Sequence, residues 1–161
     1  MSDLHLWHPR FVHFAIALLS ASILCEIIWR ITKKEVFREV AKWNLIFGGA
    51  GVVMTFISGL VAEDAVTISG AARDTFERHE TLGWITAIIT GFLLAWRIYK
   101  NGEWYEKFEN LFLILFMAAF LSMSIGSFFG GKLVYTYGVG VGQSKSATVP
   151  IPAAPTEKNE K

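Results

Sequence analysis

Four long apolar segments constrain the fold of this sequence more than any other feature. They cover roughly residues 11–30, 43–62, 80–97 and 109–129. Each approaches the length of about 20 residues that an α-helix needs to cross the hydrocarbon core of a bilayer. The chain has 161 residues and is 53% hydrophobic, which is more apolar than an ordinary soluble domain. The sequence therefore predicts an all-α membrane protein in which four transmembrane helices form one bundle.

Turn and capping residues set the expected ends of these helices. Pro9 suits the first turn of a helix, and Asp74 suits an N-cap. The expected helices are about 9–31, 43–62, 75–99 and 108–129, within one domain over residues 1–142. Residues 143–161 are rich in Pro, Ala, Ser and Lys and have no apolar periodicity, so we expect a disordered tail there.

The distribution of basic residues predicts the orientation in the membrane. The connectors after the first and third helices hold Arg30, Lys33, Lys34, Arg38, Lys42, Arg97, Lys100 and Lys107. The opposite side holds Arg10, Arg73, Arg78 and Lys132. Because basic residues favour the cytoplasmic side, we expect a multi-pass protein of the bacterial inner membrane with both termini outside.

The second half of the chain resembles the first at an offset of 67 residues. The block 29–33 falls on 96–100, Thr55 falls on Ser122, and Gly59 falls on Gly126. This pattern predicts two tandem helical hairpins related by a pseudo-twofold axis along the membrane normal.

One histidine lies early in each predicted hairpin, at His13 and His79. Both stand roughly 26 Å along the helix from the arginine of the basic ring, so they are expected at equal depth near the outer face. Ionisable residues inside spans usually mark a functional site. Taken singly, each histidine is as well explained as an interfacial or helix-start residue, but the pair predicts a shared site.

Two imidazoles at one depth suit the axial coordination of haem iron, with iron as the metal. The expected surroundings are Gly59 and Gly126 beside the macrocycle, Thr55 and Ser122 on the same wall, and Arg10 and Arg78 near the propionates. The same small residues also suit plain helix packing. The CxxCH pattern is absent, which predicts non-covalent haem b, and the single Cys25 forms no disulfide framework. His8 precedes Pro9 and is expected to point elsewhere, and its HxxH spacing with His5 is a weak metal signal.

The opening HPRFVHFAIALL, the solitary His79 and the closing GGKLVYTYGVGV resemble an uncharacterised family of small bacterial four-helix membrane proteins, over residues 8 to about 141. Members of that family are sometimes fused to Rieske iron–sulfur or c-type cytochrome domains, which implies a redox role. The chain departs from the family pattern at Ala15, where a proline commonly follows the His-Phe pair.

The leading prediction is a membrane-bound b-type cytochrome that transfers electrons through a bis-histidine haem. Expected partners are membrane lipid, quinol, and a periplasmic cytochrome c, a Rieske-type protein or a larger respiratory complex, with a homodimer left open. An electron-transfer subunit is favoured over a stand-alone enzyme, and no basic aromatic patch indicates nucleic acid. Two alternatives remain: a non-redox anchor or assembly subunit with structural histidines, and a small-solute or metal transporter.

Overall fold

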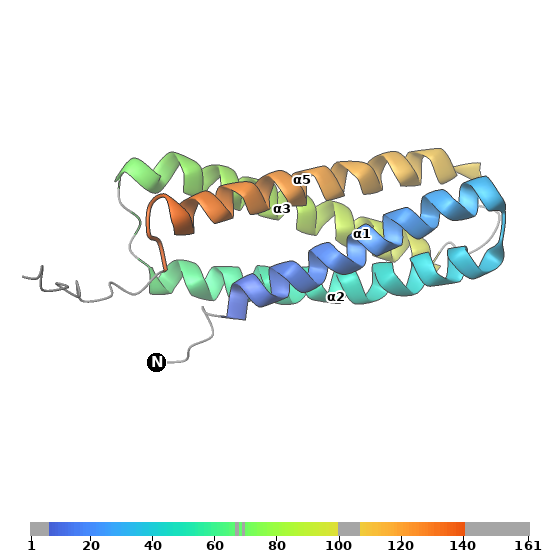
Figure 1. The fold of residues 1–161 in the computed structure, drawn as a ribbon, viewed down its shortest axis with the longest axis horizontal. Helices are drawn as coiled ribbons and strands as arrows, with labels where there is room; N and C mark the ends of the chain where they lie inside the picture. The colour runs from blue at the N-terminus through green and yellow to red at the C-terminus, as the bar shows by residue number, and fades with distance from the viewer. Residues whose placement is uncertain (1–6, 67, 69, 100–106, 141–161) are drawn as a thin grey trace, which may run out of the picture.

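The chain folds into four long helices (Figure 1). The computed structural model describes residues 7–66, 68, 70–99 and 107–140. Over these ranges the helices are α1 (His8–Thr32), α2 (Glu35–Ala65), α3 (Gly70–Tyr99) and α5 (Glu109–Tyr135). Each is long and apolar enough to cross a membrane. The predicted four-helix membrane bundle is confirmed.

The helices extend further than the apolar segments predict. The basic connector before residue 43 is mostly helical, because α2 begins at Glu35. Asp74 is not an N-cap, because α3 begins at Gly70. Similarly, α5 continues past Gly130 to Tyr135. Hydropathy marks only the part of a helix that lies in lipid, whereas Glu, Lys and Arg continue a helix readily beyond it.

The turn between α1 and α2 is short. Lys33 adopts a left-handed conformation with φ 55°, and its N–H donates to the carbonyl of Trp29 at 2.7 Å. This arrangement is a common way to end a helix. Other predicted features, namely His5 and the tail over 143–161, lie outside the described residues.

The bundle consists of two helical hairpins packed side by side (Figure 1). α1 packs mainly on α2 and α3 mainly on α5, with smaller contacts between α2 and α3 and between α1 and α5. This arrangement places α1 and α3 on one diagonal. The buried core includes Leu19, Leu45, Leu93, Phe112 and Phe116.

Small residues and hydroxyl groups join the helices within each hairpin. A Cβ atom added at Gly51 would lie 2.9 Å from the ring of Phe14, so α1 and α2 can approach closely there. The hydroxyl of Ser22 donates to the carbonyl of Ala41 at 2.7 Å. In the other hairpin, Ser122 of α5 donates to the carbonyl of Leu82 at 3.0 Å. Such close packing and interhelical hydrogen bonds hold helices together in lipid, where hydrophobic burial gives little.

Two arginines join the two hairpins at the end of the bundle away from the N-terminus. Arg30 of α1 donates to Asn110 Oδ1 at 3.0 Å and to the carbonyl of Glu109, at the start of α5. Arg97 of α3 donates to the carbonyl of Arg38, near the start of α2, at 3.1 Å. Each hairpin therefore hydrogen-bonds to the other through an arginine.

Large apolar side chains cover the outside of the bundle. Ile31, Ile88, Ile114 and Phe128 are all more than half exposed. A soluble protein of this size rarely exposes so many large apolar residues, whereas lipid tails solvate them well.

Candidate functional site

His8 is the first residue of α1, and its half-buried ring contacts α2. Its Nδ1 atom lies 3.0 Å from the carbonyl oxygen of Thr55 and 3.1 Å from the hydroxyl of Ser58. A carbonyl oxygen can only accept a hydrogen bond, so Nδ1 carries the hydrogen and donates it. The ring is thereby fixed to the C-terminal half of α2.

His79 makes the corresponding contact in the second hairpin. Its Nδ1 atom lies 2.8 Å from the carbonyl oxygen of Gly126 in α5. In both hairpins the histidine precedes its acceptor by 47 residues. The two imidazoles are therefore held in the same way, each by the return helix of its own hairpin.

The rings of His8 and His79 face each other across the diagonal of the bundle. Their centroids are 6.3 Å apart, and their planes are nearly perpendicular at 87°. They come from α1 and α3, the two helices that share few other contacts. This ring pair is the structure's candidate site.

The hydrogen bonds to Nδ1 decide which nitrogen can bind a metal. In a neutral imidazole whose Nδ1 carries the hydrogen, Nε2 keeps a free lone pair. Histidines that bind metals typically donate their other N–H to a carbonyl or carboxylate in this way. Both His8 and His79 thus have the tautomer and the hydrogen bond to a carbonyl that are typical of metal-binding histidines.

The structure brings His79 together with His8 and not with His13, the predicted partner. His13 is exposed, and its Nδ1 lies 2.6 Å from the carbonyl oxygen of Pro9, one turn earlier in the same helix. His13 lies on a different side of α1 from His8, and the ring of His8 is the one next to His79.

Glycines lie close to both imidazoles, and their predicted place beside a macrocycle stays a prediction. A Cβ atom added at Gly59 would lie 3.1 Å from Cε1 of His8, and one added at Gly130 would lie 3.0 Å from Cε1 of His79. Gly126 supplies the carbonyl for His79, and a Cβ atom there would meet Leu82 at 3.3 Å. Gly59 and Gly130 therefore hold corresponding places beside the two rings, and the predicted haem contacts of Gly59 and Gly126 stay a prediction.

The two predicted wall residues play different parts. Thr55 accepts the hydrogen bond of His8 through its carbonyl, and its own buried hydroxyl has no hydrogen-bond partner. Ser122 donates to Leu82 and so joins α5 to α3. Thr55 belongs to the site, and Ser122 belongs to the helix packing one turn deeper.

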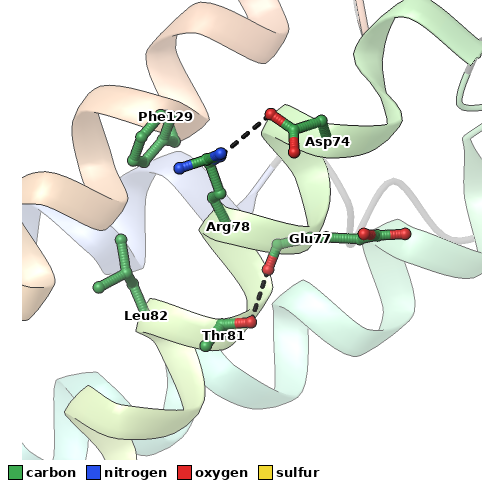
Figure 2. A pocket seen from close by; sticks show the side chains of 6 residues that line it. All are labelled: Asp74, Glu77, Arg78, Thr81, Leu82 and Phe129. Carbon is green, nitrogen blue, oxygen red and sulfur yellow. Dashed lines mark hydrogen bonds and ion pairs between the residues drawn. The ribbon is translucent and has the colours of Figure 1, made fainter.

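The two arginines predicted near the outer mouth are engaged locally. Arg10 lies over the ring of Trp7, 4.5 Å from its centroid. Arg78 binds Asp74 at 3.0 Å and lines a surface pocket of about 360 Å³ together with Leu82 and Phe129 (Figure 2). Of the two, only Arg78 directly adjoins a histidine of the ring pair in the sequence.

The contacts of the site recur at an offset of 71 residues and not 67. His8 matches His79, Thr55 matches Gly126, and Gly59 matches Gly130. The predicted offset of 67 relates Arg30 to Arg97 at the other end of the bundle. The two offsets differ by four residues, which is about one helical turn. The recurring contacts fit two tandem hairpins, whose twofold relation stays a prediction.

The sequence does contain a signal for His8. A histidine precedes a glycine by 51 positions twice, as His8 and Gly59 and as His79 and Gly130. The signal is weak because a 14-glycine chain offers many such pairs.

A metal site built from protein groups alone is not found among the described residues, where no three His, Cys, Asp or Glu side chains come together. Any metal held by His8 and His79 therefore needs further donors from outside that part of the chain. A porphyrin supplies four nitrogen donors and leaves two axial positions for histidines.

Comparison with known proteins gives a family but no characterised relative. No curated protein and no solved structure is significantly similar to the chain. A family model described as "Predicted membrane protein (DUF2231)" matches residues 4–143. This match includes all four helices and both facing histidines, so the chain belongs to the DUF2231 family of predicted membrane proteins.

Proposed function

We propose that the protein is a membrane-bound b-type cytochrome in which His8 and His79 are the axial ligands of one haem. The observation that carries the proposal is the facing ring pair, with both Nδ1 atoms bound to backbone carbonyls. A haem bound there would supply one-electron redox chemistry.

The distance between the rings supports a metal between them. An imidazole nitrogen binds a transition metal at about 2.0–2.1 Å, so two rings on opposite sides of one ion have centroids about 6 Å apart. The observed separation is 6.3 Å. Direct packing of two imidazoles would not require both Nδ1 hydrogens to be directed to carbonyls.

The chain's own residues would orient both ligands before any cofactor binds. The carbonyls of Thr55 and Gly126 fix the tautomers, and Gly59 and Gly130 let the rings lie close to α2 and α5. A haem held by both His8 and His79 would have no open position for a substrate, which would favour electron transfer over oxygen chemistry. Membrane quinol and a carrier at the outer face are the proposed donor and acceptor.

The test is the visible spectrum and pyridine haemochrome of protein purified in detergent from cells that make haem. We expect a Soret band in the wild type and in His13→Ala, the matched control, because His13 is exposed and bonds only within α1. His8→Asn and His79→Asn should lose the band, because an asparagine amide can still donate to the neighbouring carbonyl but has no Nε2.

The asparagine variants separate a ligand from a structural clamp. If they keep the Soret band, or if the wild type has none after reconstitution with haemin, the proposal fails. The second outcome would favour the non-redox alternative, an anchor or assembly subunit in which the histidines only join α1 to α2 and α3 to α5.

A further inference from the structure

A groove lies between α2 and α3, midway along the bundle and on its outer surface. Its volume is about 110 Å³, and its lining includes Gly49, Val52, Phe56, Ala87, Thr90 and Gly91. Gly91 is exposed, and a Cβ atom added there would meet nothing within 4 Å. The groove is therefore apolar and open toward lipid.

Thr90 provides the polar side chain of this groove, and its hydroxyl is not used within the protein. The residue is 2% exposed, and its Oγ1 atom has no hydrogen-bond partner. One turn earlier, Thr86 donates to the carbonyl of Leu82 at 2.8 Å, the usual arrangement for a hydroxyl inside a helix. A buried hydroxyl without a partner costs about 1–3 kcal/mol, so a ligand that accepts its hydrogen bond would bind favourably.

The corresponding interface between α1 and α5 is filled by larger side chains. At the positions offset by 71 residues, Leu19 stands for Thr90, Phe120 for Gly49 and Met123 for Val52. Leu19 and Met123 are buried in the core, and Phe120 packs against it. The smaller side chains and the free hydroxyl are therefore a property of the α2–α3 interface and not of helix packing in both halves.

We propose that this groove binds the ring of a lipid-soluble isoprenoid quinone, with a ring carbonyl accepting a hydrogen bond from Thr90. The groove holds about 110 Å³, less than the roughly 150 Å³ of a closed cavity that binds benzene, so it would enclose part of a six-membered ring and leave the rest in lipid. The open side at Gly91 leaves an exit for an isoprenoid chain. Phe56, whose ring lies 4.5 Å from that of Trp84, adds an aromatic wall.

The depth of the groove disfavours a charged lipid head group as its ligand. Thr90 follows His79 by 11 residues, which places it about 16 Å further along the helix. A charged phospholipid head group is costly at that depth, whereas a quinone is neutral and carries acceptors. The inference does not depend on the haem proposal, because His8 and His79 do not line this groove.

The test is equilibrium binding of decylubiquinone to the full chain in quinone-free nanodiscs. We expect saturable binding to the wild type, an about tenfold loss of affinity in Thr90→Val, which removes one hydrogen bond, and no saturable binding in Gly91→Leu, which fills the groove. Thr86→Val is the matched control and should bind like the wild type, because Thr86 does not line the groove.

Three outcomes would overturn the inference. They are no saturable binding to the wild type, unchanged affinity in Thr90→Val, and unchanged affinity in Gly91→Leu. If the wild type binds no decylubiquinone but Gly91→Leu changes the oligomeric state, the groove is instead a contact between two copies. His8→Asn must still bind decylubiquinone, which separates this test from that of the haem.

Discussion

At the scale of single residues, hydrogen-bond partners distinguish three histidines that hydropathy treats alike. His8, His13 and His79 each direct Nδ1 to a backbone carbonyl, but only His13 uses its own helix. Five residues rotate a position by about 140° around a helix, so His8 and His13 cannot both face the bundle. The sequence places a histidine near this depth, but only the packing of α1 on α2 decides which one faces inward.

Substituting Gly130 tests whether the imidazole of His79 requires a glycine at the facing position of α5. Gly130→Ala should lower the stability of the folded protein by about 1–3 kcal/mol, because the new Cβ atom would lie 3.0 Å from a ring that is already fixed by a 2.8 Å hydrogen bond. The measurement is the unfolding midpoint in detergent, together with the haem content of the same preparation.

Gly131→Ala is the neighbouring control for that substitution. A Cβ atom at Gly131 meets nothing within 4 Å, so alanine there should be neutral or stabilise the helix by up to about 1 kcal/mol. Equal midpoints for the two alanine variants would show that the close approach at Gly130 does not constrain His79.

At the scale of helices, the sequence predicts the number of helices well but predicts the positions of their ends poorly. Length and hydropathy identify all four helices, because crossing a bilayer requires about 20 apolar residues. The ends at Glu35 and Gly70 lie among charged or small residues, where hydropathy carries no information, and α5 runs past two glycines to Tyr135. The early start of α1, at His8, is what brings that histidine into the bundle.

Hydroxyl groups at the α1–α2 interface allow a test of helix packing. Ser22→Ala should lower stability by about 0.5–1.5 kcal/mol, because it removes a buried 2.7 Å hydrogen bond to the carbonyl of Ala41 in the next helix. Ser20→Ala is the control, since Ser20 donates only to Ile16 within α1. If both variants unfold at the same midpoint, the interhelical hydrogen bond adds nothing beyond packing.

At the scale of the whole molecule, the two hairpins share a burial pattern but differ in chemistry. Ala15 and Thr86 are both buried at positions 71 apart, and so are Glu26 and Arg97. The histidine hydrogen bonds and the glycine contacts occur in both hairpins. In contrast, the corresponding positions Glu26 and Arg97 carry opposite charges. Composition alone cannot reveal this difference between the hairpins, because it does not show which positions are buried or which groups a buried charge contacts.

The two ends of the bundle are also chemically different, and this difference predicts the orientation. The histidine pair lies at the end where α1 starts and α2 ends, whereas Arg30, Arg38 and Arg97 gather at the other end. Because basic residues favour the cytoplasmic side, the histidine end should face outward. Single cysteines test this in a Cys25→Ser background, at Asp64→Cys and Lys34→Cys, both of which are exposed positions at opposite ends of α2.

A membrane-impermeant maleimide should label Asp64→Cys in spheroplasts of a bacterial host and label Lys34→Cys only after the membrane is opened. The reason is that Lys34 is the N-cap of α2 and Asp64 lies in its last turn, so one helix reports on both faces. The reverse pattern would place the histidine pair at the cytoplasmic face. A haem there would exchange electrons with cytoplasmic partners, and the proposed carrier at the outer face would have to be replaced.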